Sequence, residues 1–220
     1  MRGLRILPIA SFAAVILMGA WGVRAYAQET PASESRGMPP RTGPGEYQSQ
    51  AKAGMLTVGA EFMGHSVPTP DAIYMTEEYV VVEVGLFGPP EARATLSATD
   101  FSLRINGRKA APSQPFELVA KSLKDPEWEP SSKADKSKGG LSTGGGGNSG
   151  DPPPTPPKMP PELRRAMNQR VQRTGMLEGD RALPQAGLLF FEYRGKTENL
   201  RSLELIYSGS GGNAVVVLHP

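Results

Sequence analysis

The chain has no cysteine and only two histidines among its 220 residues. Without cysteine, no disulfide can cross-link the fold and no lipid can be attached to an N-terminal cysteine. His65 and His219 are far apart in sequence, and there is no thiolate to complete the usual ligand sets for zinc or other transition metals. We therefore predict no metal and no cofactor, and a fold that is stabilised by apolar burial alone.

The sequence also lacks the common catalytic motifs. No Gly-x-Ser-x-Gly elbow is present, and the glycine run at 144–147 is not followed by the Gly-Lys-Ser/Thr ending of a phosphate-binding loop. We predict a protein that is not an enzyme, with no catalytic residues. The alternative is a hydrolase with a carboxylate site on the loops of a β-sandwich, for which the candidates are Glu77, Glu78, Glu83 and Asp100.

The numbers of positive and negative side chains are nearly equal. The chain carries 24 basic and 22 acidic residues, but three of the basic residues (Arg2, Arg5 and Arg24) lie within the first 27. The remainder therefore has 21 basic and 22 acidic residues, and we expect no nucleic-acid partner.

The first 27 residues have the pattern of a secretory signal peptide. Arg2 and Arg5 precede an apolar run over 6–23, and Ala25 and Ala27 lie at the positions that a signal peptidase reads. We predict a secreted or periplasmic protein with no transmembrane span after cleavage. The alternative is an uncleaved anchor, because a run of about 18 apolar residues just spans a bilayer.

Residues 28–53 are rich in proline, glycine, serine and glutamate without apolar periodicity, and we predict a disordered tail there. Beyond residue 54, short alternating or continuous apolar runs predict β-strands. Val67–Pro70 is predicted to interrupt regular structure, and Asn106-Gly107 to form the tight turn of a hairpin that returns over 109–112. The predicted strands are 57–63, 78–87, 101–105, 116–120, 188–194, 203–207 and 214–218.

These strands fall into two blocks, 54–121 and 183–220, and neither can bury its apolar faces alone. The strands of the later block lie within the 34 residues 187–220, and domains below about 40 residues usually need a disulfide, metal or partner. We therefore predict one antiparallel sandwich of seven or eight strands, with 122–182 as a flexible insertion that costs little loop entropy. The predicted core is Val80, Val82, Val84, Leu86, Phe101, Leu103, Ile105, Leu189, Phe191, Leu203, Leu205 and Val217.

One helix is predicted inside the insertion, near 161–174. Pro161 suits the first turn, Gly175 suits the end, and an apolar stripe is formed by Leu163, Met167 and Val171. The helix either contacts an anionic surface such as lipid headgroups or is a solvated helix that packs on the sandwich by its stripe. The candidates for surface contact are Arg164, Arg165, Arg170 and Arg173.

The order of the strand motifs resembles the small secreted immunoglobulin-like domains of bacteria, a largely uncharacterised group that includes a mycobacterial secreted immunogenic antigen. The similarity covers residues 54–121 and 183–219 and differs at Gly88-Pro89-Pro90 and in the long insertion. The residues that carry it are Asp100, Phe101 and Leu103, then Leu183, Pro184 and Gly187, then Phe190 and Phe191, and finally Leu203, Leu205 and Tyr207.

The resemblance implies an immunoglobulin-like fold with no enzymatic activity and no cofactor. Together with the signal pattern, it predicts a monomeric, exported, non-catalytic module of the cell envelope that binds another molecule or has a structural role. The expected partner is an envelope protein or surface that the sequence does not identify.

Overall fold

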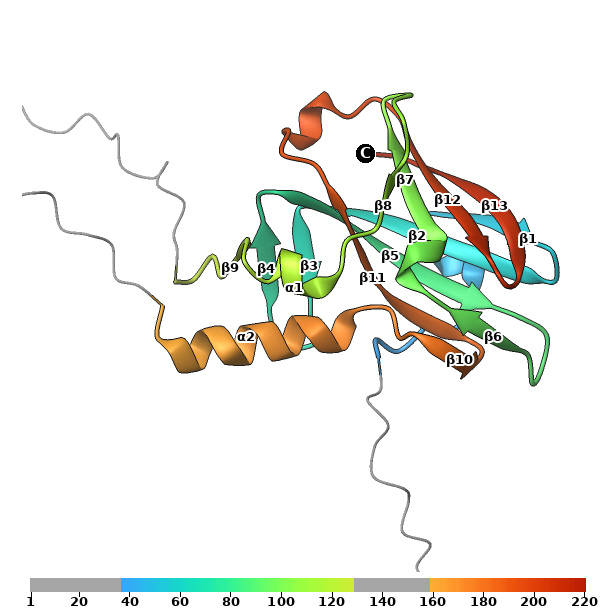
Figure 1. The fold of residues 1–220 in the computed structure, drawn as a ribbon, viewed down its shortest axis with the longest axis horizontal. Coiled ribbons are helices and arrows are strands. Elements are labelled where there is room, and N and C mark those ends of the chain that lie inside the picture. Colours follow the sequence, from blue (N-terminus) through green and yellow to red (C-terminus); the bar gives the residue numbers. More distant parts are fainter. Residues whose placement is uncertain (1–36, 129–158) are drawn as a thin grey trace, which may run out of the picture. The chain divides into compact units, whose positions relative to one another are not determined.

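The computed structural model describes residues 37–128 and 159–220 (Figure 1). The predicted signal peptide and the start of the predicted tail lie outside the described residues, as does 129–158. The described part is mostly β, with antiparallel sheets and two α-helices. This confirms a β-rich antiparallel fold.

The main sheet has four antiparallel strands and takes strands from both sides of residues 129–158. Its strands, in spatial order, are β1 (Ser49–Ala53), β2 (Leu56–Gly64), β5 (Tyr79–Phe87) and β11 (Gln185–Glu192). β5 confirms the strand predicted over 78–87 and lies between β2 and β11, and Tyr79 to Leu86 are all buried. β11 lies beside it, with Leu189 opposite Val82. The early and late blocks of the sequence thus form one sheet.

The second sheet also has four antiparallel strands. In spatial order they are β13 (Gly212–Leu218), β12 (Leu203–Gly209), β7 (Phe101–Ile105) and β8 (Ala111–Pro112). The predicted hairpin is confirmed: Asn106 and Gly107 have φ of 51° and 68°, and β8 returns to pair with β7. Both residue types tolerate this left-handed backbone.

The two sheets share one core. It contains alternate residues of β5 (Val80, Val82, Val84 and Leu86), Leu189 and Phe191 of β11, and inward residues of the second sheet such as Phe101 and Leu203. Ten of the twelve predicted core residues are buried, and Ile105 is partly buried against them. The prediction of Val217 is wrong. Its side chain is 55% exposed because the alternation of β13 turns Ala214, Val216 and Leu218 inward instead.

The opposite face of the main sheet is covered by a second layer (Figure 1). This layer has the helices α1 (Phe116–Val119) and α2 (Pro161–Thr174), and a small sheet of β3 (Ser66–Pro68), β4 (Ile73–Thr76) and β9 (Leu123–Lys124). Its core combines Val81, Leu188 and Phe190 of the main sheet with Met167 and Val171 of α2. The main sheet is therefore buried on both faces.

Three predictions are corrected here. The strand predicted over 116–120 is wrong: Phe116–Val119 form α1, because only Phe116 and Val119, three residues apart, face the core. The segment predicted to interrupt regular structure, 67–70, contains part of β3. The segment 122–182, predicted as a flexible insertion with one helix, also contributes β9 and β10 (Gly179–Ala182), and β10 pairs with β6 (Arg93–Leu96). The helix near 161–174 is confirmed as α2.

The predicted disordered tail over 28–53 is wrong for its described end. Residues 37–48, here called the strap, lead into β1, and the ring of Tyr47 lies against the main sheet at Gly59 and Gly85. These glycines are paired in register. A Cβ on either would lie within 2.7 Å of a Tyr47 ring or hydroxyl atom, so only glycine leaves room for the ring.

Arg41 fastens the strap to two neighbouring carboxylates of the main sheet. Its Nε and Nη2 donate to both oxygens of Glu83 at 3.0 and 2.7 Å, and its Nη1 lies 2.5 Å from Glu61 Oε2. The hydrogen bond to Glu83 raises the pKa of Arg41 above its ordinary value, and the guanidinium also lies 4.5 Å from the centre of the Tyr47 ring. The arginine thus neutralises Glu83, whose side chain is only 5% exposed.

Truncating the shared core should unfold the protein far more readily than truncating the neighbouring surface. Phe101→Ala or Leu203→Ala should lower the free energy of unfolding by about 2 to 5 kcal/mol, because each removes a fully buried side chain. Val217→Ala, on an exposed position, should change it by less than about 0.5 kcal/mol. Denaturant unfolding measures all three, and equal costs would contradict the core assignment.

The Arg41–Glu83 pair should show strong energetic coupling. Arg41→Ala leaves the Glu83 carboxylate buried without its cation, which should cost about 3 kcal/mol. The double variant Arg41→Ala/Glu83→Gln should cost less than the sum of the two single variants, because the glutamine needs no counter-ion. A double-mutant cycle by denaturant unfolding provides the measurement, and additive costs would show that the strap does not depend on this pair.

Candidate binding groove

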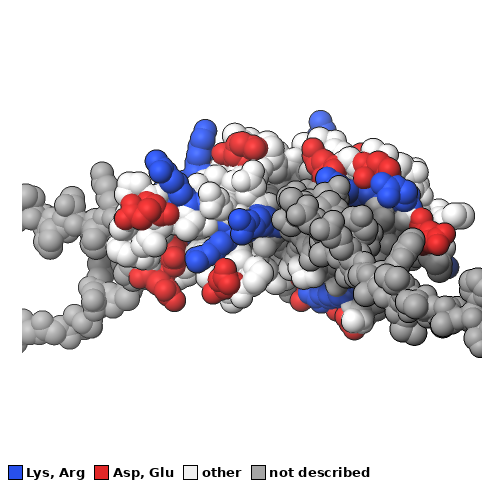
Figure 2. Space-filling model, turned by 90° about the horizontal axis from the view of Figure 1, so that it is seen from below, with Lys and Arg blue, Asp and Glu red and all other residues white. Residues whose placement is uncertain are grey.

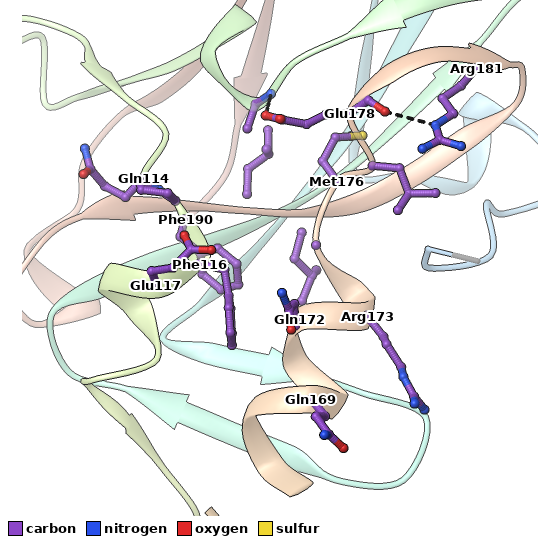
Figure 3. Close-up of a pocket in the computed structure, with 16 residues that line it drawn as sticks. Gln114, Phe116, Glu117, Gln169, Gln172, Arg173, Met176, Glu178, Arg181 and Phe190 are labelled. Atoms are coloured by element: carbon purple, nitrogen blue, oxygen red, sulfur yellow. Dashed lines mark hydrogen bonds between the residues drawn. The ribbon is translucent and has the colours of Figure 1, made fainter. Parts of the chain in front are cut away.

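A groove of about 780 Å³ opens beside β11, between α1 and the C-terminal end of α2 (Figure 3). One wall is formed by residues 114–117. The other is formed by Gln169, Gln172 and Arg173 of α2 and the segment 175–178 that follows it. Its volume lies in the range of small-ligand and peptide-side-chain sites.

The floor of the groove is the edge of β11, and this edge is already hydrogen-bonded. The N–H of Gln114 donates to Phe190 O at 2.7 Å, and the N–H of Met176 donates to Leu188 O at 3.3 Å. Gly187 allows this close approach, because a Cβ there would lie 2.4 Å from the Cα of Met176. A ligand in the groove therefore meets side chains rather than a free strand edge.

Polar side chains surround an apolar centre. Phe116, Met176 and Leu177 are partly exposed within the groove, while the amides of Gln169 and Gln172 stand on the exposed side of α2. Amides both donate and accept hydrogen bonds, and guanidinium groups bind carboxylates in two-point geometry. The charged residues that line the groove are Glu117, Arg173, Glu178 and Arg181.

Glu178 and Arg181 are fixed at one end of the groove (Figure 3). Glu178 Oε1 accepts the N–H of Ala98 at 3.3 Å, and Arg181 Nε donates to the main-chain oxygen of Glu178 at 3.0 Å. These contacts join the segment after α2 to the turn before β7. The position of the guanidinium is thereby set by the fold.

The structure does not gather the four predicted surface-contact arginines on one face. Arg170 Nη1 donates to Tyr74 Oη at 2.9 Å, which raises the pKa of Arg170, and its Nε lies 3.4 Å from Asp71. Arg164 is partly buried and, at 3.6 residues per turn, lies on the opposite side of the helix from the exposed Arg173, while the exposed Arg165 lies between them. Figure 2 shows cations and anions interspersed on the face seen from below. In the described part of the chain, no helix is long and apolar enough to cross a membrane.

The four candidate carboxylates are dispersed. Glu83 is held by Arg41, Glu77 lies 2.8 Å from Lys124 Nζ, and Glu78 lies 3.7 Å from Arg194. Burial raises the pKa of the Asp100 carboxyl, and none of the three cations Arg41, Lys124 and Arg194 pairs with it. Each of the first three carboxylates thus interacts with a different cation.

His65 has a structural position. Its Nδ1 lies 2.7 Å from Tyr79 O and its Nε2 lies 3.0 Å from Gly195 O, and its ring stacks on Tyr193. Within residues 37–128 and 159–220, no group of three or more histidine, aspartate or glutamate side chains is arranged to hold a metal ion.

No family model, curated protein or solved structure matches this chain. The resemblance to bacterial immunoglobulin-like domains therefore stays a prediction, and the chemistry of the groove rests on its own side chains. Sequence reasoning missed the groove because its walls come from segments more than 50 residues apart, and one of them was predicted as a strand. The signal for the groove that the sequence did offer was the pair of glutamines on α2, Gln169 and Gln172.

Arg170 should stabilise the fold, whereas Arg165 should not. Arg170→Ala removes the hydrogen bond to Tyr74 and should lower the melting temperature, while Arg165→Ala, which removes an exposed arginine from the same helix, should leave it unchanged. Thermal unfolding followed by circular dichroism measures both. Equal melting temperatures for the two variants would show that the Arg170 contact does not tether α2.

Proposed function

We propose that the protein is a non-catalytic binding module of the cell envelope that holds a peptide segment of a partner protein in the groove between α1 and α2. The observation that carries this proposal is the composition of the groove. Glutamine amides and two guanidinium groups surround an apolar centre, beside a strand edge that is already hydrogen-bonded.

The side chains of the groove favour a peptide over a sugar. Amides on α2 can pair with peptide N–H and C=O groups, and Arg173 and Arg181 suit an acidic side chain or a C-terminal carboxylate. Phe116 is the partly exposed ring, and the neighbouring Met176 and Leu177 are flexible or branched side chains that adapt to another side chain. Sugar sites rely more on flat, exposed aromatic surfaces.

The scaffold supports an immunoglobulin-like interpretation. Two four-stranded antiparallel sheets share a core, and several residues of the resemblance, among them Phe101, Leu203 and Tyr207, lie within it. The layer of α2 and the small sheet is an addition to such a sandwich. Export rests on the signal pattern of residues 1–27.

Two alternatives are less well supported. A hydrolase needs two carboxylates directed at one bond, whereas Glu77, Glu78 and Glu83 each contact a different cation. Surface association through α2 needs arginines free to face the surface, whereas Arg170 is bound to Tyr74.

The proposal is tested with an array of short immobilised peptides of varied sequence. We expect the purified protein to select peptides in which a carboxylate neighbours an apolar residue, because these match the arginines and the centre of the groove. Phe116→Ala/Arg173→Ala should weaken binding of the selected peptides by about tenfold or more. Fluorescence anisotropy with labelled peptides measures the affinities.

The matched control is Arg165→Ala, which removes a charge from α2 outside the groove. It should bind like the parent, and circular dichroism should show that every variant is folded. Selection of no peptide, or equal affinity of the parent and the groove variant, would exclude the proposed site. Amide chemical-shift changes in the parent should be centred on Gln114, Gln172 and Met176.

A further inference from the structure

A second cavity, of about 960 Å³, lies apart from the groove, at the turn that follows β7. We refer to it as the cationic cleft. One wall is the turn at 105–109, and the other is the segment 192–202 between β11 and β12. The inner surface includes Leu103 of β7. None of the residues that line it also lines the groove beside β11.

Positive charge predominates in the cationic cleft. Arg108 and Lys109 come from the turn and Arg194 and Arg201 from the facing segment, against two glutamates, Glu192 and Glu198. Arg194 makes only long contacts of 3.7 Å, with Glu192 and Glu78. Among the residues that the structure describes, the other three cations form no ion pair within 4 Å, so their charge is not compensated by close contacts.

Asn106 ties the two walls together. Its side-chain amide donates to Asn199 O at 3.0 Å and accepts the N–H groups of Arg201 and Ser202 at 2.7 and 3.3 Å. Its own N–H donates to Ser202 O at 2.9 Å. These four hydrogen bonds fix the backbone of the turn relative to Arg201. The turn, in which Asn106 has φ of 51°, carries Arg108 and Lys109.

The outer part of the facing segment is fixed independently. His65 Nε2 contacts Gly195 O, the His65 and Tyr193 rings stack at 6.2 Å, and Tyr193 Oη donates to Lys196 O at 3.1 Å. Both walls therefore have backbones that hydrogen bonds fix in place, and their cationic side chains are exposed. This arrangement positions several charges for one ligand at a small entropic cost.

We propose that the cationic cleft binds clustered phosphate groups. Three of its four cations are arginines, whose planar guanidinium groups hold phosphate oxygens by two parallel hydrogen bonds, and Lys109 adds a point charge. Two or more phosphates close together engage the four cations at once, and the lining keeps an excess of two positive charges over the two glutamates, which attracts an anion of several charges most strongly. The phosphates belong either to a soluble polyphosphate or to lipid headgroups.

The test uses inorganic tripolyphosphate as the soluble probe, at low ionic strength, with calorimetry as the readout. The lipid arm is sedimentation with phosphatidylcholine vesicles, with and without phosphatidic acid. We expect saturable binding in at least one arm, weakened by added salt. Tripolyphosphate binding without pelleting assigns a soluble ligand, and pelleting only with phosphatidic acid assigns headgroups.

Arg108→Ala/Arg201→Ala should weaken binding about tenfold or more, because each substitution removes a charged hydrogen-bond donor. The control Lys52→Ala/Arg165→Ala removes the same net charge from exposed positions outside the cleft and should bind like the parent. If the alanine variant melts early, Arg108→Gln/Arg201→Gln retains polar side chains and should show the same loss. No binding in either arm, or equal losses in the control and the cleft variants, would overturn the proposal.

Discussion

Burial of both faces of the main sheet is the constraint on which the rest of the structure depends. Val80, Val82 and Val84 of β5 pack against the second sheet, while Val81 packs under the layer that contains α2. A strand of this kind needs a cover on each side, because either apolar face alone would remain in water. The α2 helix and the small sheet are therefore part of the fold rather than an attachment to it.

The same constraint explains the strap. The main sheet carries Glu61 and Glu83 beside each other on the face that α2 covers elsewhere, so the sheet needs a cation where helix packing ends. Arg41 supplies it, and Tyr47 fills the shallow space above Gly59 and Gly85. Charge neutralisation and ring packing together extend the cover over the main sheet.

Sequence periodicity was sufficient for the central features. The apolar run over 78–87 predicted a strand and the Asn106-Gly107 dipeptide predicted a hairpin, because both signals are local in the sequence. Periodicity did not identify the buried face of a strand where consecutive residues are all valine. In β13, three consecutive valines do not show which of them faces inward, and Val217 was assigned to the wrong face.

Elements fixed by distant contacts were also missed. The strap has no apolar periodicity, and its position depends on Arg41 and Tyr47, whose partners lie in β2 and β5. Four residues were too few to distinguish α1 from a strand. The groove and the cationic cleft each combine segments far apart in the chain, so their residue types were visible but their proximity was not.

The hydrogen bond from Met176 to β11 has a consequence for misfolding. The segment after α2 shields a strand edge, and the helix itself covers Leu188 and Phe190 on the same strand. Detachment of α2 would expose unpaired main-chain groups and an apolar surface at the same time. This combination promotes aggregation, because the exposed strand edge can pair with a strand of another molecule. Secure docking of this helix is thus also a safeguard against aggregation.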